Sequence, residues 1–434
     1  MNYASIVRVL ALIMLILAGS ALLPTLVAAI AGETDQVVAF IVMAIGIIVL
    51  ASSVLLLTPK PERKARPSDA LAVVIIWWFM APFAAALPFV LGVPDRSILH
   101  AIHEAASCLT TTGHTVVLTE GSSWPASLVV WRGILHIIGG LASITTAASV
   151  LAAINLGGPG IHRTVLFTVP ETSFFDAVPR VARAVFAMMI ICIIVLLGLL
   201  IMAGVPFPRA LSDSVSAITT GLVDPYALGR RALPPFPNLI LGAGLIVGAL
   251  GLAVWLPLKD RKPRAALMDP ETLVFLFTNS PVRDTIPLPI LVLPSLIGGS
   301  ALSAAGGVKI ARLIVLGRRA DQEFRQLGYR RSVLGFRFRD RDLDERSVIG
   351  VWVYLIAYIV AVFVMMVGFS FLSLPFEDTI RLAIGGLTNS GALLLGHTDH
   401  LDGGTTSLLI LSMLLGRLEI LAVIPALSPS FWRG

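Results

Sequence analysis

Three short sequences contain the residues whose types and spacing could do chemistry. They read Thr110-Thr111-Thr112-Gly113, Thr219-Thr220-Gly221 and Thr388-Asn389-Ser390-Gly391, and each follows an apolar stretch too short to cross a bilayer. Glycine adopts a positive φ at little cost, so a turn that contains it can point backbone carbonyls inward. A ring of such carbonyls can replace the hydration shell of a potassium ion, and the negative C-terminal end of a preceding short helix favours a cation there. The pattern therefore predicts a filter for cations.

Long apolar segments surround these turns. Of the 434 residues, 56% are hydrophobic and only 13% are charged, whereas a soluble domain has about 25% charged residues. Apolar segments lie near 5–31, 36–58, 70–92, 127–154, 181–204, 237–258, 286–316, 347–373 and 405–427. We expect an all-α polytopic membrane protein.

The three turns occur at matching places in an internal repeat. Each stands in the order outer helix, half-length helix, turn, inner helix, and such a repeat decides the architecture. Lipid cannot satisfy the backbone ends of a half-length helix, so these ends must line protein or a water-filled cavity. Pore-loop repeats fit this requirement.

Basic clusters give the expected orientation. They include Arg63-Lys64, Lys259 to Arg264 and the largest group, Arg312 to Arg331. The positive-inside rule places these loops and both termini in the cytoplasm. Cys108 and Cys192 lie far apart in apolar surroundings, which favours buried side chains over a disulfide. No Cys/His metal spacing, Walker loop or hydrolase elbow is present, so we expect neither an enzyme nor an organic cofactor.

Several motifs resemble the Trk/Ktr/HKT superfamily of potassium transporters, in particular its TrkH branch. Leu109 to Gly113 looks like the first filter of that family, and Trp131-Arg132-Gly133 with Gly139-Gly140 looks like its first inner helix. The segment 298–312 resembles its intramembrane loop, and 414–419 with the ending 429–433 resembles its C-terminus.

The resemblance implies four pseudo-symmetric helix–pore-loop–helix repeats around a central pore, plus an N-terminal helix pair. It also implies a homodimer and a cytosolic TrkA/KtrA-like nucleotide-binding subunit that gates the pore. The expected parts are an N-terminal transmembrane helix pair (1–60), a first repeat (67–155), a second (176–258), a truncated third with the gating loop (265–317), a cytoplasmic linker (318–346) and a fourth (347–434).

The same resemblance assigns roles to single residues. The implied ion filter consists of Thr111, Thr112, Gly113, Thr219, Thr220, Gly221, Asn389, Ser390 and Gly391. The implied gating loop below it contains Gly298, Gly299, Ser303, Gly306, Gly307 and Lys309. Arg417 is placed at the inner pore as an electrostatic barrier.

The third repeat departs from the family pattern. Too little chain lies between Lys259 and Gly298 for an outer helix, a pore helix and a filter, and Thr278 to Pro281 contains no glycine. Proline cannot replace a glycine with positive φ. Either 286–316 forms a broken re-entrant hairpin, which we favour, or 265–285 crosses the membrane in a strained way. His114 also stands where the family has a small residue.

Ionisable residues within apolar segments suggest function. His103 and Glu104 either attract cations or form a pair on a helix surface. His136 lines either a helix–helix contact or the pore, and Lys309 and Arg312 either anchor the loop or follow the positive-inside rule. The run 317–346 is a solvated linker that could dock a gating partner.

The sequence thus predicts potassium uptake across the bacterial inner membrane, with potassium as the permeant ion. The alternative is a degenerate, non-conducting or weakly selective (sodium/potassium) chain that acts as a regulatory or assembly subunit. The truncated third repeat motivates this alternative.

Overall fold

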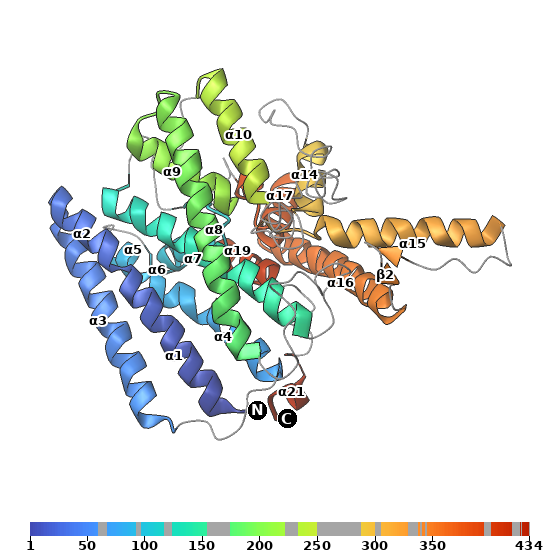
Figure 1. Cartoon of the computed structure of the whole chain (residues 1–434), viewed down its shortest axis with the longest axis horizontal. Helices are drawn as coiled ribbons and strands as arrows, with labels where there is room; N and C mark the ends of the chain where they lie inside the picture. Colours follow the sequence, from blue (N-terminus) through green and yellow to red (C-terminus); the bar gives the residue numbers. More distant parts are fainter. Residues whose placement is uncertain are drawn as a thin grey trace.

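The computed structural model describes residues 1–59, 67–92, 97–116, 124–153, 174–221, 233–249, 288–299, 305–328, 337–338, 341–342, 345–394, 401–418, 426 and 428–433. Helices dominate this part of the chain (Figure 1). Six of them are long and apolar enough to cross a membrane: Tyr3–Ala31, Thr34–Leu57, Ser68–Leu91, Ala126–Thr146, Val181–Met202 and Ile349–Ser370. The predicted all-helical polytopic class is confirmed.

The N-terminal helices pack against each other. The first span consists of α1 (Tyr3–Ser20) and α2 (Leu22–Ala31), and Gly32 ends it with φ 73°. The chain then returns through α3 (Thr34–Leu57), which packs on both. Arg8 on α1 donates to the carbonyls of Leu55 and Thr58, so the two ends of the hairpin are bound together.

Three groups of helices follow the order of an outer helix, a short helix and an inner helix. The first contains α4 (Pro67–Ala85), α5 (Leu87–Gly92), α6 (Ile98–Leu109) and α7 (Ala126–Ala153). The second contains α8 (Phe174–Met202), α9 (Phe207–Thr219) and α10 (Pro235–Ala249). The last contains α16 (Glu345–Ser370), α17 (Phe376–Leu387), α18 (Gly391–Leu394) and α19 (Gly403–Arg417).

The three short helices begin in similar ways. Ser97 caps α6 by accepting from the backbone N–H of His100. Pro206 and Pro375 occupy the N-cap positions of α9 and α17, with the extended backbone that an N-cap requires. Each helix is therefore started by a local signal in the sequence.

Each short helix lies between two inner helices. Helix α6 contacts α7 and α19, and α9 contacts α10 and α7. Helix α17 contacts α19 and α14 (Leu288–Ile297). Neighbouring elements thus follow the spatial order α10, α9, α7, α6, α19, α17 and α14, with α14 beside α17 where the repeat pattern would put a third inner helix.

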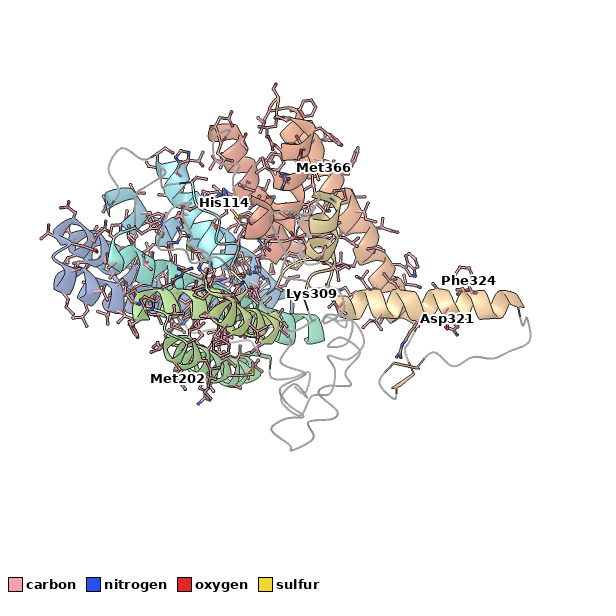
Figure 2. All side chains as sticks on the ribbon, turned by 90° about the horizontal axis from the view of Figure 1, so that it is seen from above. His114, Met202, Lys309, Asp321, Phe324 and Met366 are labelled. Carbon is pink, nitrogen blue, oxygen red and sulfur yellow. The ribbon has the colours of Figure 1, made fainter. Side chains whose placement is uncertain are left out.

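Helix α15 (Ile310–Gly328) extends away from the body of the molecule (Figures 1 and 2). Lys309 lies where this helix joins the body, and Asp321 and Phe324 lie along the extended part (Figure 2). The expected boundary between repeat and linker at 317/318 therefore falls inside one continuous helix. Beyond it lie a two-stranded hairpin, β1 (Arg337–Phe338) and β2 (Arg341–Asp342), and, at the C-terminus, α21 (Pro429–Arg433).

The expected break in 286–316 is present as the Gly-rich segment between α14 and α15. The backbone N–H groups of Val308, Lys309 and Ile310 donate to the carbonyls of Leu296, Ile297 and Gly299 at 2.9, 3.0 and 3.1 Å. The chain therefore returns alongside the end of α14. The stretches 265–285 and 278–281, on which the third filter depends, lie outside the described residues.

Candidate functional site: the turns that end the short helices

The three turns share one backbone hydrogen-bond pattern. In each, one N–H donates three residues back and the next donates five residues back, which is a Schellman-type helix end. The pairs are Thr111–Cys108 and Thr112–Ser107, Thr220–Ala217 and Gly221–Ser216, and Asn389–Gly386 and Ser390–Gly385, at 2.9–3.3 Å.

The left-handed position of each turn is not a glycine. It is Thr111, Thr220 or Asn389, with φ of 55°, 58° and 51°. Of the three implied filter glycines, only Gly113 has a positive φ, at 74°. The expectation that the glycine of each turn has a positive φ therefore holds for Gly113 and is wrong for Gly221 and Gly391, because in those turns only the residue at the helix end has the left-handed conformation.

The shared hydrogen-bond pattern also changes the alignment of the second turn with the other two. Thr111, Thr220 and Asn389 correspond, so Gly221 corresponds to Thr112 and Ser390 rather than to Gly113 and Gly391. The residue that follows Gly221 in the chain is Leu222, which lies outside the described residues.

Glycines on the inner helices give a second, independent measure of this register. Gly139 of α7 and Gly416 of α19 lie against the carbonyls of Leu109 and Leu387, and Gly248 of α10 lies against those of Ala217 and Ile218. Leu109, Ile218 and Leu387 each precede the left-handed residue by the same number of positions. A Cβ on any of the three glycines would overlap the backbone of the short helix. Glycine therefore allows each inner helix to approach the turn.

Side chains connect the first turn to the last. Arg417 donates through Nε to the carbonyl of Thr110 and through a terminal nitrogen to the hydroxyl of Thr111. Asn389 Nδ2 donates to Thr112 Oγ1 at 3.2 Å and to the Met413 carbonyl at 2.9 Å. Arg417 thus binds the first turn directly.

His136 of α7 lies between the first and second turns. It is fully buried, and its Nδ1 donates to the carbonyl of Arg132 at 2.8 Å. A Cβ on Gly221 would lie 2.6 Å from His136 Nε2 and 2.7 Å from the Thr111 carbonyl oxygen. His136 therefore forms a helix-to-turn contact, and Gly221 is required by this close approach rather than by its φ.

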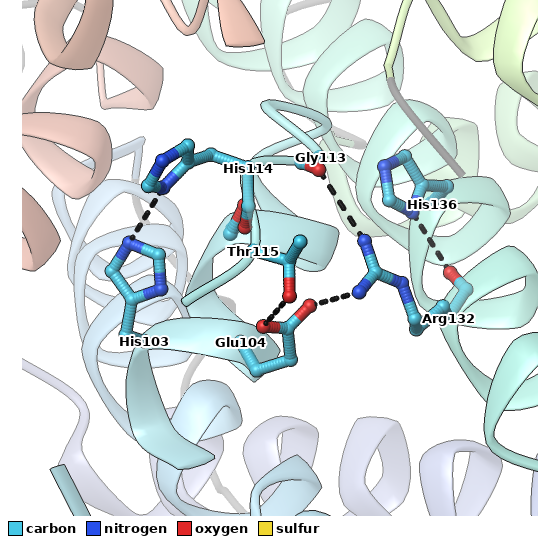
Figure 3. Close-up of polar contacts among 8 residues, drawn as sticks. His103, Glu104, Gly113, His114, Thr115, Arg132 and His136 are labelled. Atoms are coloured by element: carbon cyan, nitrogen blue, oxygen red, sulfur yellow. Dashed lines mark hydrogen bonds and ion pairs between the residues drawn. The ribbon is translucent and has the colours of Figure 1, made fainter. Parts of the chain in front are cut away.

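A buried ion pair lies beside the other end of the first turn (Figure 3). Arg132 of α7 pairs with Glu104 of α6, with side chains 1% and 0% exposed. The second terminal nitrogen of Arg132 donates to the Gly113 carbonyl at 3.3 Å. Thr115 donates to the other oxygen of Glu104 at 2.9 Å. The guanidinium also lies 4.9 Å from the ring centre of Trp124.

His103 and His114 are packed edge to face in the same region (Figure 3). Nδ1 of His114 lies 3.5 Å from Nε2 of His103, and both rings are buried. Of the two alternatives for His103 and Glu104, the pair on a helix surface is therefore wrong, because both side chains are buried.

The implied gating loop lies directly against the last turn. A Cβ on Gly306 would overlap the carbonyl of Thr388, and Ser295 of α14 donates to Ser390 Oγ at 3.3 Å. Gly298 and Gly307 contact each other's backbone. Gly299 is buried, and Ser303 lies outside the described residues.

Two basic residues hold the end of this loop. Lys309, with φ 74°, donates to the carbonyl of Ala305, and Arg312 donates to that of Val308 at 3.2 Å. The Arg312 guanidinium also lies 3.9 Å from the ring centre of Tyr354 on α16. These contacts favour loop anchoring over a purely topological role.

Sequence reasoning missed the pairing of Glu104 with Arg132, the contact of Arg417 with Thr110 and the three inner-helix glycines. A signal for the glycines was available. Each lies about 30 residues after the end of its short helix. Such a constant spacing is expected in an internal repeat. No comparable spacing marks the ion pair.

The fold and the site define a class: an all-helical, polytopic membrane protein in which short helices end in turns that contact one another. Comparisons with known proteins agree with this class. The solved structure of the potassium transporter TrkH from Vibrio parahaemolyticus superposes with a TM-score of 0.85 at 24% identity and covers 100% of both chains.

Sequence relatives extend the comparison. The chain is 25% identical to the Trk system potassium uptake protein TrkH of Salmonella typhimurium over 489 residues, which covers 100% of both chains. It is 25% identical to TrkI of Halomonas elongata, covering 100% of this chain and 97% of that one. No family model matches. The resemblance stated from the motifs is confirmed.

Proposed function

We propose that this chain moves potassium ions across the bacterial inner membrane as the membrane subunit of a Trk-type uptake system. The observation that supports this most directly is the connection between the three turns. They share one backbone geometry, and Asn389 bonds Thr112 while Gly221 lies against Thr111. Separate ordinary turns would have no reason to meet in this way.

The proposed path uses backbone and hydroxyl oxygens. Carbonyls of the turns at 111–113, 219–221 and 389–391 replace the hydration shell of the ion. The C-terminal ends of α6, α9 and α17 point their negative dipole ends at the same place. The ion moves down its electrochemical gradient, and no covalent step is involved.

The Gly-rich loop is the proposed gate. Gly306 lies against Thr388, and Lys309 and Arg312 fix the end of the loop next to α15. Because α15 begins directly after Lys309, a movement of α15 would be transmitted to the loop. Arg417 then acts as a barrier and as a support for the first turn.

The proposed assembly is a homodimer with a cytosolic TrkA/KtrA-like nucleotide-binding subunit. Extension of α15 away from the body supports a docking role for that helix (Figure 2). The basic clusters support a cytoplasmic position for this helix and for both chain termini. Full-length similarity to potassium uptake proteins gives no support to the alternative of a regulatory subunit.

The test is uptake of rubidium, used as a tracer for potassium, into liposomes that contain the purified protein. Sodium is the competitor, and Gly113→Asp is the control variant. The substitution places a side chain at a φ of 74° and a carboxylate beside the Gly113 carbonyl. We expect uptake by the wild type and none by this variant.

Absence of uptake from folded, dimeric wild-type protein, with and without a cognate nucleotide-binding subunit, would contradict the proposal. Equal uptake by the wild type and Gly113→Asp would contradict the assignment of the filter.

A further inference from the structure

The Glu104–Arg132 pair is buried in the protein, where a charge pair has a high desolvation cost. Removing both charges from water costs several kcal/mol for each ion, and such a pair is often replaceable by apolar residues. The pair is therefore poorly explained as a source of stability alone. Its position beside the turn suggests another reason.

The guanidinium has two separate tasks in this geometry. One terminal nitrogen binds Glu104, and the other binds the Gly113 carbonyl at 3.3 Å. Glu104 is held in turn by Thr115 at 2.9 Å, and the backbone of Arg132 is held by His136. The orientation of the Arg132 guanidinium is thus fixed by Glu104 on one side and by the Gly113 carbonyl on the other (Figure 3).

Two arginines therefore bind opposite ends of the first turn. Arg417 binds the Thr110 carbonyl and Arg132 binds the Gly113 carbonyl. The carbonyls of Thr111 and Thr112 lie between these two points. With both ends held, the intervening peptide planes can turn only by coupled changes of the φ and ψ angles of Thr111 and Thr112.

We propose that Glu104 and Arg132 are a positioning pair that sets the ion selectivity of the first turn by holding the Gly113 carbonyl. Selectivity depends on the number and orientation of coordinating carbonyls. Glu104 balances the charge of Arg132, so the pair orients a carbonyl without repelling the cation. This inference rests on the proposed function.

Lysine cannot replace the arginine in this role. A guanidinium presents a rigid fork that reaches two acceptors at once, whereas an ammonium is a point charge on a flexible stem. Arg132→Lys therefore keeps the charge balance with Glu104 and loses the second contact. A matched control is Arg381→Lys, which makes the same exchange in an ion pair with Glu377 on the surface of α17.

The experiment compares wild type, Arg132→Lys, Thr115→Val and Arg381→Lys. One readout is the sodium concentration that halves rubidium uptake into liposomes. The other is the difference in melting temperature between potassium and sodium chloride, which reports ion binding without transport. For Arg132→Lys we expect sodium to compete at a concentration about tenfold lower, and the difference in melting temperature to shrink.

Thr115→Val removes one of the bonds that steady Glu104 and leaves the contacts of Arg132 in place, so a smaller change in the same direction is expected. Arg381→Lys should match the wild type in both readouts. If Arg132→Lys does not fold, Thr115→Val decides the question. Folded variants with the sodium competition and ion-specific melting of the wild type would overturn the inference.

The two proposals fail in different ways. A wild type that imports no rubidium overturns the proposed function. The ion-specific melting of the variants still tests the positioning pair in that case, and a wild type without such a difference overturns the pair as well.

Discussion

At the scale of single residues, the left-handed positions are informative because they are not glycine. A β-branched residue with positive φ is an outlier, and such strain costs about 1–3 kcal/mol. Thr111 and Thr220 have this conformation; the Thr111 hydroxyl accepts from Arg417, and the Thr220 hydroxyl donates to the neighbouring Thr219 carbonyl. Asn389 tolerates the conformation better and uses its amide to reach the first turn. The side chain at each of these positions therefore makes a hydrogen bond that glycine could not make.

Asn389 gives a prediction at this scale. Asn389→Asp keeps the shape of the side chain and removes both amide N–H donors, which bind Thr112 Oγ1 and the Met413 carbonyl. We expect a loss of about 1–3 kcal/mol in the free energy of unfolding, because two buried hydrogen bonds are lost. Thermal melting in detergent measures this loss, and rubidium uptake should fall with it.

Asn389→Gly serves as the comparison, since it relieves the positive φ while removing the amide. Impaired uptake in both variants would assign the effect to the amide. Normal uptake in Asn389→Gly would show that only the backbone conformation matters there.

At the scale of elements, the inner helices are fitted to the ends of the short helices. Gly139, Gly248 and Gly416 each stand against a carbonyl near the end of the short helix. Helix α7 is therefore placed close enough for Arg132 and His136 to reach the turns. If an added methyl group on Gly139 pushed α7 away from the short helix, Arg132 and His136 would move away from the turns as well.

Gly139→Ala is expected to impair both folding and uptake, because its Cβ would overlap the backbone of Leu109. Overpacking of this kind costs about 1–3 kcal/mol. The control is Gly242→Ala on α10, where a Cβ meets nothing within 4 Å. That change should be neutral or stabilise the helix by up to about 1 kcal/mol. If Gly139→Ala and Gly242→Ala lowered the melting temperature equally, this account would be contradicted.

At the scale of the whole molecule, a carboxylate joins the N-terminal helices to α7, in addition to the packing of these helices on α4, α5 and α7. Glu33, between α2 and α3, accepts from the backbone N–H groups of Ala126 and Ser127 at 2.7 and 3.2 Å, and from the Ser127 hydroxyl. It thus caps the N-terminus of α7, the helix that contains Arg132. The favourable charge at a helix N-terminus adds to these bonds.

Glu33→Ala should lower the free energy of unfolding by about 0.5–2 kcal/mol, the usual effect of losing a cap. Glu33→Gln should lose less, since its amide oxygen can still accept. Chemical or thermal unfolding measures both. An unchanged stability in Glu33→Ala would mean that this cap does not contribute to holding the N-terminal helices in place.

Much of this architecture could be predicted from the sequence. Apolar length identified the spans, and the repeated Thr/Asn/Ser-Gly turns located the ends of α6, α9 and α17. Prolines and glycines marked the break between α14 and α15. These are local properties, since chain length and residue type decide them before any tertiary contact forms.

The register of the second turn and the partners of Arg132, Asn389 and Arg417 could not be predicted in this way. Arg417 and Thr110 are 307 residues apart in sequence, and Asn389 and Thr112 are 277 apart. No periodicity connects such pairs.

By itself, then, the sequence determined that the chain crosses a membrane repeatedly and presents short helices ending in polar turns. Hydrophobic length and backbone conformational preference act along the chain, and both can be read from it. Only the tertiary structure decided which groups hold the turns in place. Those contacts depend on how α7 and α19 approach the short helices, and that approach is set by packing between segments far apart in the sequence.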